Sequence, residues 1–135
     1  MATESTLLIV KPDGVRRRLV GEVLRRVEAK GLAIEQLDLR VIERGTVEAH
    51  YGEHRDKPFF AELVDFITGG PVVVAKITGD DAITCWRMLM GPTNPIEAPP
   101  GSIRGDFATE IGENVVHGSD SAESAARELA LFFGG

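Results

Sequence analysis

The chain of 135 residues contains a single cysteine, and none of its apolar runs approaches the roughly 20 residues that a membrane-spanning helix needs. One cysteine excludes an intramolecular disulfide and a metal site built from several cysteines. Basic residues are also fewer than acidic ones: 15 Lys and Arg stand against 21 Asp and Glu, which gives a net charge of −6. This balance argues against a general binder of nucleic acid or anionic membranes, because both require a positive field.

The remaining composition favours one folded domain. A chain of this length usually forms a single unit, and 43% hydrophobic with 27% charged residues can bury a core rather than stay disordered. The N-terminal segment Met1–Thr6 is polar, with no apolar signal segment behind it. We therefore expect one domain over residues 1–135 and a cytoplasmic location.

Several well-known site motifs are missing as well. There is neither a Walker A sequence nor a GxGxxG sequence, so phosphate chemistry would have to use scattered cations. His50 and His54 lie four residues apart, a spacing that could place two imidazoles on one helix face. However, Glu53 stands beside the second histidine, so the HExxH zinc pattern is absent. A packing or surface role is favoured for this pair over a metal site.

Hydrophobic periodicity predicts alternating strands and helices. Strands are expected at Thr6–Val10, Leu37–Val41, Val72–Ala75 and Asn114–His117. Helical spacing is found over Val20–Val27, Thr46–His54, Pro58–Ile67, Ala82–Leu89 and Ala122–Phe133. In the last helix the predicted apolar face consists of Ala122, Ala126, Leu129 and Phe133. The order predicts an α+β protein in which an antiparallel four-stranded sheet carries helices on one face, on the ferredoxin-like plan.

Proline and glycine mark the predicted connections. Lys11–Gly14 is expected to be a turn, because Pro12 fixes φ and Gly14 tolerates positive φ. Gly91–Gly101 holds four of the seven prolines and is expected to be a loop without helix or strand. Asp120 is expected to cap the last helix, with Glu123 as its capping-box partner.

His117 is the most informative single residue, because it ends a predicted strand just before a helix N-terminus. The unpaired N–H groups of a helix start suit an anion such as phosphate. A neutral imidazole would also offer a lone pair on one nitrogen. Glu128, 11 residues further on, lies at the flank of the predicted apolar face and could hold the other nitrogen. The alternatives are a structural histidine and a solvated glutamate, and the residues alone leave both open.

Three cations could meet a phosphate near that strand end. Lys11 ends a buried strand, Arg87 flanks a helix stripe, and Arg104 lies between glycines that allow a close approach of the backbone. Each taken alone is more commonly a solvated or ion-paired charge. The run Arg16–Arg18 is interpreted as a solvated face.

Four segments together resemble the nucleoside diphosphate kinase family. They are Thr6–Gly14 (TLLIVKPDG), Gly91–Pro95 (GPTNP), Ser102–Phe107 (SIRGDF) and Asn114–Ser124 (NVVHGSDSAES). The resemblance runs from about Thr6 to Phe133. It implies an enzyme that moves the γ-phosphoryl group of a nucleoside triphosphate to a nucleoside diphosphate, with broad base and sugar specificity, and so maintains NTP and dNTP pools.

The resemblance also implies roles for particular residues. His117 would be the nucleophile through Nδ1, held by Glu128, with Ser119 supporting both. Lys11 would contact the transferring phosphate and the ribose 3′-OH, Asn114 the ribose hydroxyls, and Tyr51 the region beside the histidine. Arg87, Thr93 and Arg104 would bind the β- and γ-phosphates. Phe59 would stack on the base, with Leu63 and Ile111 lining the same pocket.

The family further implies Mg²⁺ that arrives on the nucleotide phosphates with few or no direct protein ligands, and a homo-oligomer. A hexamer is favoured over a tetramer, although the chain ends at Gly135 without the extension that many eukaryotic members wrap onto a neighbour. Arg18 and Pro92 stand where many members differ.

Two alternatives to an active kinase stay open. A nucleotide-binding module on the same fold would be expected to lose one of His117, Glu128, Lys11 and Arg104, and all four are present. A DNA-binding protein or nuclease is disfavoured by the net charge of −6.

Overall fold

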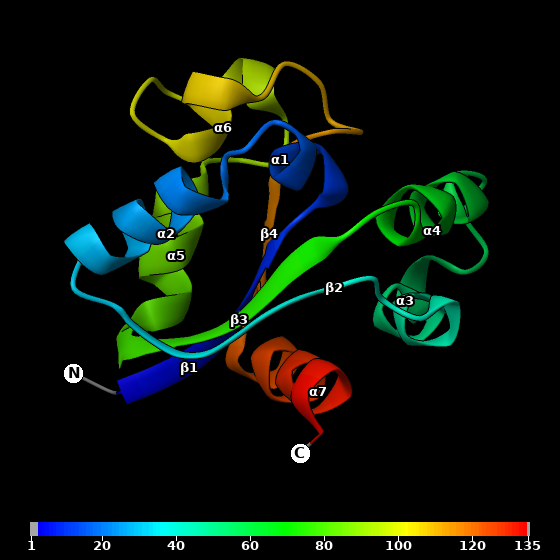
Figure 1. The fold of residues 1–135 in the computed structure, drawn as a ribbon, viewed down its shortest axis with the longest axis horizontal. Coiled ribbons are helices and arrows are strands. Elements are labelled where there is room, and N and C mark those ends of the chain that lie inside the picture. Colours follow the sequence, from blue (N-terminus) through cyan, green and yellow to red (C-terminus); the bar gives the residue numbers. More distant parts are fainter. Residues whose placement is uncertain (1–2, 135) are drawn as a thin grey trace.

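A computed structural model describes residues 3–134, so the first two residues of the polar N-terminal segment and Gly135 lie outside the described residues. One sheet has the strand order β2-β3-β1-β4, and each neighbouring pair is antiparallel. The strands are β1 (Thr3–Val10), β2 (Ala33–Arg40), β3 (Val72–Asp80) and β4 (Val116–Gly118). The predicted α+β class and ferredoxin-like plan are confirmed (Figure 1).

Helices cover both faces of the sheet, which corrects the expectation of one covered face. The helices are α1 (Pro12–Arg16), α2 (Val20–Ala29), α3 (Arg44–His50), α4 (Phe60–Thr68), α5 (Ala82–Met90), α6 (Ile103–Phe107) and α7 (Ala122–Phe133), with short 3₁₀ turns η1 (Gly52–His54) and η2 (Pro95–Glu97). Figure 1 shows α2 and α5 on one side of the strands and α7 on the other.

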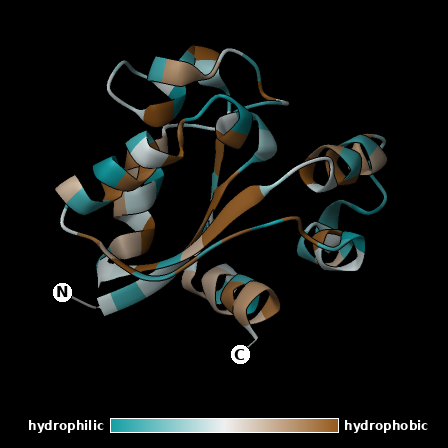
Figure 2. Ribbon diagram, viewed as in Figure 1, coloured by the Kyte–Doolittle hydropathy of each residue, from teal (hydrophilic) through white to brown (hydrophobic). Residues whose placement is uncertain are grey.

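Two apolar cores result from the alternation of side chains along the inner strands. On β1, Leu8 and Val10 join a core with Trp86 of α5, whereas Leu7 and Ile9 join a second core with Phe132 of α7. Successive residues of a strand point to opposite faces, so a continuous apolar run serves both cores. Figure 2 shows the same hydrophobic character in the first half of β3.

The segment after β1 is the short helix α1 rather than the predicted turn. Pro12 occupies its first turn, where the missing N–H costs nothing. A Cβ at Gly14 would lie 2.7 Å from Val10 Cγ1 and 3.1 Å from the carbonyl oxygen of Val115. Glycine is therefore required here by the close approach of α1 to the β4 edge, and not by a positive φ.

The proline-rich loop contains more regular structure than expected. Asn94 accepts a hydrogen bond from the N–H of Ile96 at the start of η2. Ser102 then caps α6 by accepting from the N–H of Gly105. The prediction of a loop without helix was wrong at η2, because proline fits the first turn of a short helix.

The last helix spans the predicted Ala122–Phe133, but its cap and its buried face differ from the prediction. Its cap is Ser121, whose hydroxyl accepts from the N–H of Ser124, so the prediction of an Asp120 cap was wrong. The buried face consists of Ala125, Glu128 and Phe132 instead of the predicted apolar set. Glu128 therefore lies at the centre of the buried face, and the expectation that it lies at the flank is corrected.

The outer strand β2 is exposed along most of its length. Leu37, Leu39 and Val41 are 53%, 62% and 59% exposed, so the apolar side of this strand is uncovered in the single chain. Leu37 and Leu39 pair with Ala75 and Val73, which belong to the core face shared with α2 and α5. None of the helices within residues 3–134 combines the length and the apolarity needed to cross a membrane.

Candidate active site

β4 presents His117 at the outer edge of the sheet, opposite Ile9 of β1. Its Nε2 lies 2.9 Å from Oε1 of Glu128 on α7. We assign the proton to Nε2 because the carboxylate can only accept, and Nδ1 then keeps a free lone pair. Burial lowers the pKa of His117, and the charges of Lys11 and Arg104 lower it further, against the opposing effect of Glu128. The ring is therefore neutral and nucleophilic at physiological pH.

Glu128 is itself held from a second side. It is 5% exposed, and the hydroxyl of Ser119 donates to the same Oε1 at 2.8 Å. Burial on its own would raise the pKa of this carboxyl group, but the hydrogen bonds from His117 and Ser119 outweigh it and keep the pKa below its usual value. An ionised carboxylate that fixes the imidazole tautomer is the result.

Lys11 and Asn114 form a second polar contact near the same strand end. The Lys11 ammonium donates to Asn114 Oδ1 at 2.8 Å, and Asn114 Nδ2 donates to the carbonyl of Thr93 at 3.0 Å. Burial and the nearby charge of Arg104 lower the pKa of Lys11 to about 8. At neutral pH the lysine is therefore still a cation, but it gives up its proton more easily than an ordinary lysine.

Arg104 is buried and uses its guanidinium to hold backbone. It donates to the carbonyls of Asn114 (3.2 Å), Gly91 (2.9 Å) and Val116 (2.7 Å). Burial and the charge of Arg87 lower its pKa to about 10. A guanidinium has five N–H donors, so donors are left for an anionic ligand after these three contacts.

His50 is a neighbour of the catalytic candidate that the sequence spacing did not indicate. It is 4% exposed, and its ring centroid lies 4.7 Å from that of His117 and 4.4 Å from that of Tyr51. Burial lowers its pKa to about 3, and burial raises the pKa of the Tyr51 phenol above its usual value. The side chains of His50 and Tyr51 are therefore both uncharged where they lie beside His117. His50 ends α3 whereas His54 lies in η1, so the two do not share a helix face.

The reactive side chains open into a hollow of about 270 Å³. Its lining consists of His50, Tyr51, Glu53, His54, Arg87, Thr93, His117, Gly118, Asp120, Ser124 and Glu128. Histidine, carboxylate and arginine side chains from both sides of the sheet thus meet at one point. Of the predicted residues, Tyr51, Arg87, Thr93 and Glu128 share this hollow with His117.

The remaining predicted residues lie around that hollow rather than in its lining. Phe59 is 47% exposed and Ile111 is 56% exposed, while Leu63 packs partly buried against the core that contains Phe132. The Phe59 ring centroid lies 5.6 Å from that of His54. The exposed Phe59 ring beside His54 could hold a flat aromatic ligand.

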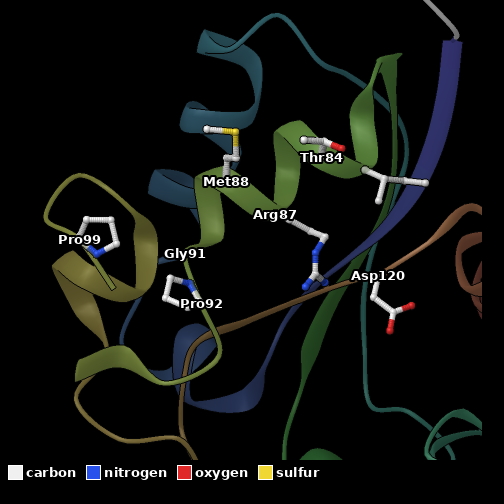
Figure 3. A pocket seen from close by; sticks show the side chains of 8 residues that line it. Thr84, Arg87, Met88, Gly91, Pro92, Pro99 and Asp120 are labelled. Atoms are coloured by element: carbon white, nitrogen blue, oxygen red, sulfur yellow. The ribbon is translucent and has the colours of Figure 1, made fainter. Parts of the chain in front are cut away.

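A larger hollow of about 500 Å³ adjoins the site through Arg87. It is lined by Ile83, Thr84, Arg87, Met88, Gly91, Pro92, Pro99 and Asp120. In Figure 3 the Arg87 side chain reaches from α5 into the space between Pro92 and Asp120. Because it lacks an imidazole, we place the chemistry in the smaller hollow in spite of the difference in volume.

Within residues 3–134, the histidine and carboxylate group closest to a metal-binding arrangement is His50, His117 and Glu128, whose potential ligand atoms lie within 4.8 Å of one another. Two imidazoles and one carboxylate do not fit Mg²⁺, which prefers oxygen ligands and retains water. Glu128 is also already engaged by His117 and Ser119. This donor set gives no reason to expect a resident magnesium ion.

Comparisons with known proteins agree over the whole chain. A family model described as nucleoside diphosphate kinase matches residues 4–135. A nucleoside diphosphate kinase of Parafrankia sp. (strain EAN1pec) is 59% identical over 135 residues, covering 100% of this chain and 98% of that relative. One of Deinococcus radiodurans is 60% identical over 131 residues, covering 97% and 95%.

A solved structure leads to the same conclusion. The halophilic nucleoside diphosphate kinase from Halobacterium salinarum in complex with CDP matches with a TM-score of 0.96 and 45% identity, over 99% of this chain and 90% of that chain. Fold, site and matches together define a phosphotransferase that acts on nucleotides. The chain belongs to the nucleoside diphosphate kinase family.

Proposed function

We propose that this enzyme works by a ping-pong mechanism through a phosphohistidine on His117. In the first half-reaction Nδ1 attacks the γ-phosphorus of a nucleoside triphosphate, the bond to the β–γ bridging oxygen breaks, and the nucleoside diphosphate leaves. In the second, a β-phosphate oxygen of another nucleoside diphosphate attacks the same phosphorus, and the bond to Nδ1 breaks. One histidine thereby serves donor and acceptor in turn.

The observation that carries this proposal is the 2.9 Å contact between His117 Nε2 and Glu128 Oε1. It fixes the ring and leaves Nδ1 as the free nitrogen. Because the carboxylate is buried and held by Ser119, it cannot follow the imidazole, so a rotation of the ring would break the contact with Glu128. Orienting groups of this kind usually contribute one to two orders of magnitude to activity.

The surrounding cations would stabilise the negative charge of the phosphoryl group during its transfer. Phosphoryl transfer requires positioning and electrostatic stabilisation rather than covalent work by the protein. We propose that Lys11 and Arg104 bind the γ-phosphate. Arg87 and Thr93 would bind both the β- and the γ-phosphate. Tyr51 keeps its proton because burial raises its pKa, so its hydroxyl can donate to the transferring group.

We assign the nucleoside to the apolar rim and to Asn114. Phe59 would stack on one face of the base, with Leu63 and Ile111 beside it, and Lys11 and Asn114 would meet the ribose hydroxyls. Stacking tolerates every base, so we expect rate preferences below about a hundredfold among ATP, GTP, CTP and UTP. Such breadth would suit an enzyme that maintains NTP and dNTP pools in the cytoplasm.

We propose that Mg²⁺ arrives with the nucleotide and has no direct protein ligand. When bound to the nucleotide, it would neutralise part of the charge of the phosphates. The donor set of His50, His117 and Glu128 suits this view, since its imidazoles are poor ligands for magnesium.

We also propose a homo-oligomer, with a hexamer favoured over a tetramer. The exposed apolar residues Leu37, Leu39 and Val41 on an edge strand support a protein partner on this side of the sheet. The net charge of −6 argues against nucleic acid as a partner.

The decisive experiment uses ATP labelled at the γ-phosphate with no acceptor present. We expect an acid-labile, base-stable phosphoenzyme that loses its label when GDP is added. His117→Asn should not label, whereas His54→Asn, a change in another histidine of the same hollow, should label like the unmodified enzyme. Labelling of His117→Asn at the unmodified level would disprove the assignment of the nucleophile.

A further inference from the structure

The backbone just before His117 has an unusual conformation. Val115 is fully buried and has a φ of 73°, a region that β-branched residues rarely adopt. The N–H of Val116 donates to the carbonyl of Asn114 at 2.8 Å, which closes a three-residue γ-turn around Val115. This is the rare form of the turn with positive φ. Strained residues of this kind persist only where their surroundings hold them.

The turn solves a geometric problem of the site. In an extended strand Asn114 and His117 would face opposite sides, because their positions differ by three, an odd number. Here Asn114 binds Thr93, and Thr93 lines the same hollow as His117. The γ-turn changes the direction of the chain between the two residues, so both serve one site.

Both polar groups of the Val115 residue are held by the segment that follows β1. Its N–H donates to Asp13 Oδ2 at 3.0 Å, and its carbonyl accepts from the N–H of Lys11 at 2.8 Å. Arg104 binds the carbonyls on either side, those of Asn114 and Val116. Among these contacts, only the one from Asp13 is made by a carboxylate side chain. Asp13 has no other part in the proposed chemistry.

Asp13 lies in an environment that a carboxylate seldom occupies. It is 1% exposed, and its Oδ1 has no hydrogen-bond partner among the described residues. Burial raises its pKa, against the lowering effects of the Val115 N–H and the charge of Lys11. A Cβ at the neighbouring Gly14 would lie 2.7 Å from Val10 Cγ1 and 3.1 Å from the carbonyl oxygen of Val115, so α1 packs tightly against β1 and the turn, and Asp13 has little freedom to move. A buried acid with one unsatisfied oxygen is costly unless the contact that it makes is needed.

We infer that Asp13 is a positioning residue for phosphoryl transfer, which acts by holding the strained turn at Val115 and thereby aligns His117 with Asn114. This inference rests on the proposed role of His117 as nucleophile. It assigns Asp13 no contact with the substrate.

The test compares Asp13→Ala with the conservative Asp13→Asn in single-turnover phosphorylation by ATP. Asparagine can still accept from the Val115 N–H, whereas alanine leaves this donor buried and unpaired. For Asp13→Ala we expect the rate constant of phosphorylation to fall about ten- to a hundredfold, because small misplacements of reacting groups cost that much. The dissociation constant of the nucleotide should change less than the rate constant, since Arg87 and Phe59 do not depend on this turn, although Asn114 belongs to it.

Asp13→Asn should recover most of the rate, and Asp65→Ala, which removes an exposed carboxylate paired with Arg44, should leave it unchanged. Hydrogen exchange at the Val115 amide should speed up in Asp13→Ala alone. If that variant does not fold, Asp13→Ser provides the same comparison with a weaker acceptor.

Two results are distinguishable. A label on a residue other than His117 in the unmodified enzyme would overturn the proposed mechanism. A label on His117 in the unmodified enzyme, combined with an unmodified rate in folded Asp13→Ala or with no recovery in Asp13→Asn, would overturn the role of Asp13 and leave the mechanism intact.

Discussion

The two outer strands of the sheet differ in how far other side chains cover their free edges. β2 has eight residues, is exposed along most of its length and carries uncovered leucines. β4 has three residues, and side chains occupy its backbone: Arg104 binds the carbonyl of Val116, and Trp86 donates to the carbonyl of His117 at 3.2 Å. An unpaired edge attracts another strand or protein unless it is blocked. The β4 edge is therefore partly covered by side chains, whereas the longer β2 edge is the one on which we propose the subunit contact.

The same contrast extends to charge. Around β4, burial and the charge of Arg104 lower the pKa of Lys11, and the hydrogen bonds from His117 and Ser119 lower the pKa of Glu128 against the effect of burial. On β2, the exposed Leu37 and Leu39 alternate with charged residues such as the exposed Asp38. The proposed reactive surface and the proposed associating surface thus lie on opposite edges of one sheet. Changes at one edge should then leave the function of the other intact.

The largest effect is expected from Glu128→Gln at the β4 edge. The amide can still contact His117, but it no longer stabilises the imidazole as a carboxylate does. Turnover should fall about ten- to a hundredfold while the fold is kept. Steady-state transfer from ATP to a nucleoside diphosphate measures this loss, and Glu123→Gln on the exposed first turn of α7 is the matched control. Unchanged turnover would show that Glu128 is only a structural residue.

A second prediction concerns pH and Lys11. The pKa of about 8 means that its ammonium is charged below pH 8 and becomes neutral above it. The value of kcat/KM should therefore fall as pH rises through about 8, by roughly tenfold per pH unit on the alkaline side. On the acid side, activity should persist below the usual pKa of histidine, because the pKa of His117 is lowered and the neutral ring attacks.

Lys11→Arg tests this assignment directly. A guanidinium stays charged, so the alkaline fall near pH 8 should disappear even if the plateau is lower. Lys57→Arg, a change in an exposed lysine of the α3–α4 connection, should keep the unmodified profile. An alkaline fall that survives in Lys11→Arg would show that another group is responsible.

At the opposite edge we expect a smaller change, and one confined to assembly. Leu39→Glu places a charge within the apolar stripe of β2, and burying a leucine contributes about 1.5–3 kcal/mol to an interface. The dissociation constant of the oligomer should rise about tenfold or more, as measured by sedimentation equilibrium. Gln36→Glu on the same strand controls for charge. Equal assembly of the two variants would place the subunit contact elsewhere.

The sequence predicted the strands because their apolar runs and alternation are local properties. It missed that helices cover both faces of the sheet, since that depends on how many elements pack there and not on the pattern of one strand. It also predicted the wrong face of α7. A search for apolar spacing passes over Glu128, although this acid is at the centre of the buried face.

The site was predictable in part for a similar reason. His117 and Glu128 occur in segments that resemble a family, and their distance in the fold agrees with the expected partnership. The neighbouring His50 and the contact from Asp13 to Val115 depend on the close approach of α3 and α1 to β4. No spacing along the chain indicates such contacts, because they join residues that are far apart in sequence.

The smallest effect should come from the second strained residue, Arg18, which has a φ of 62° in the exposed connection between α1 and α2. The left-handed conformation costs an L-residue roughly 1–2 kcal/mol, and a glycine at this position would avoid that cost. Part of the gain in stability is offset because glycine loses more entropy on folding. Arg18→Gly should therefore raise the free energy of unfolding by about 0.5–1 kcal/mol without changing turnover. Urea denaturation at matched protein concentration measures this change in the free energy of unfolding.

In contrast, Val115→Gly would relieve strain inside the site, and we expect it to lower the phosphorylation rate because the turn would lose its rigidity. If both glycine variants kept full activity, the strain at Val115 would be as dispensable as that at Arg18.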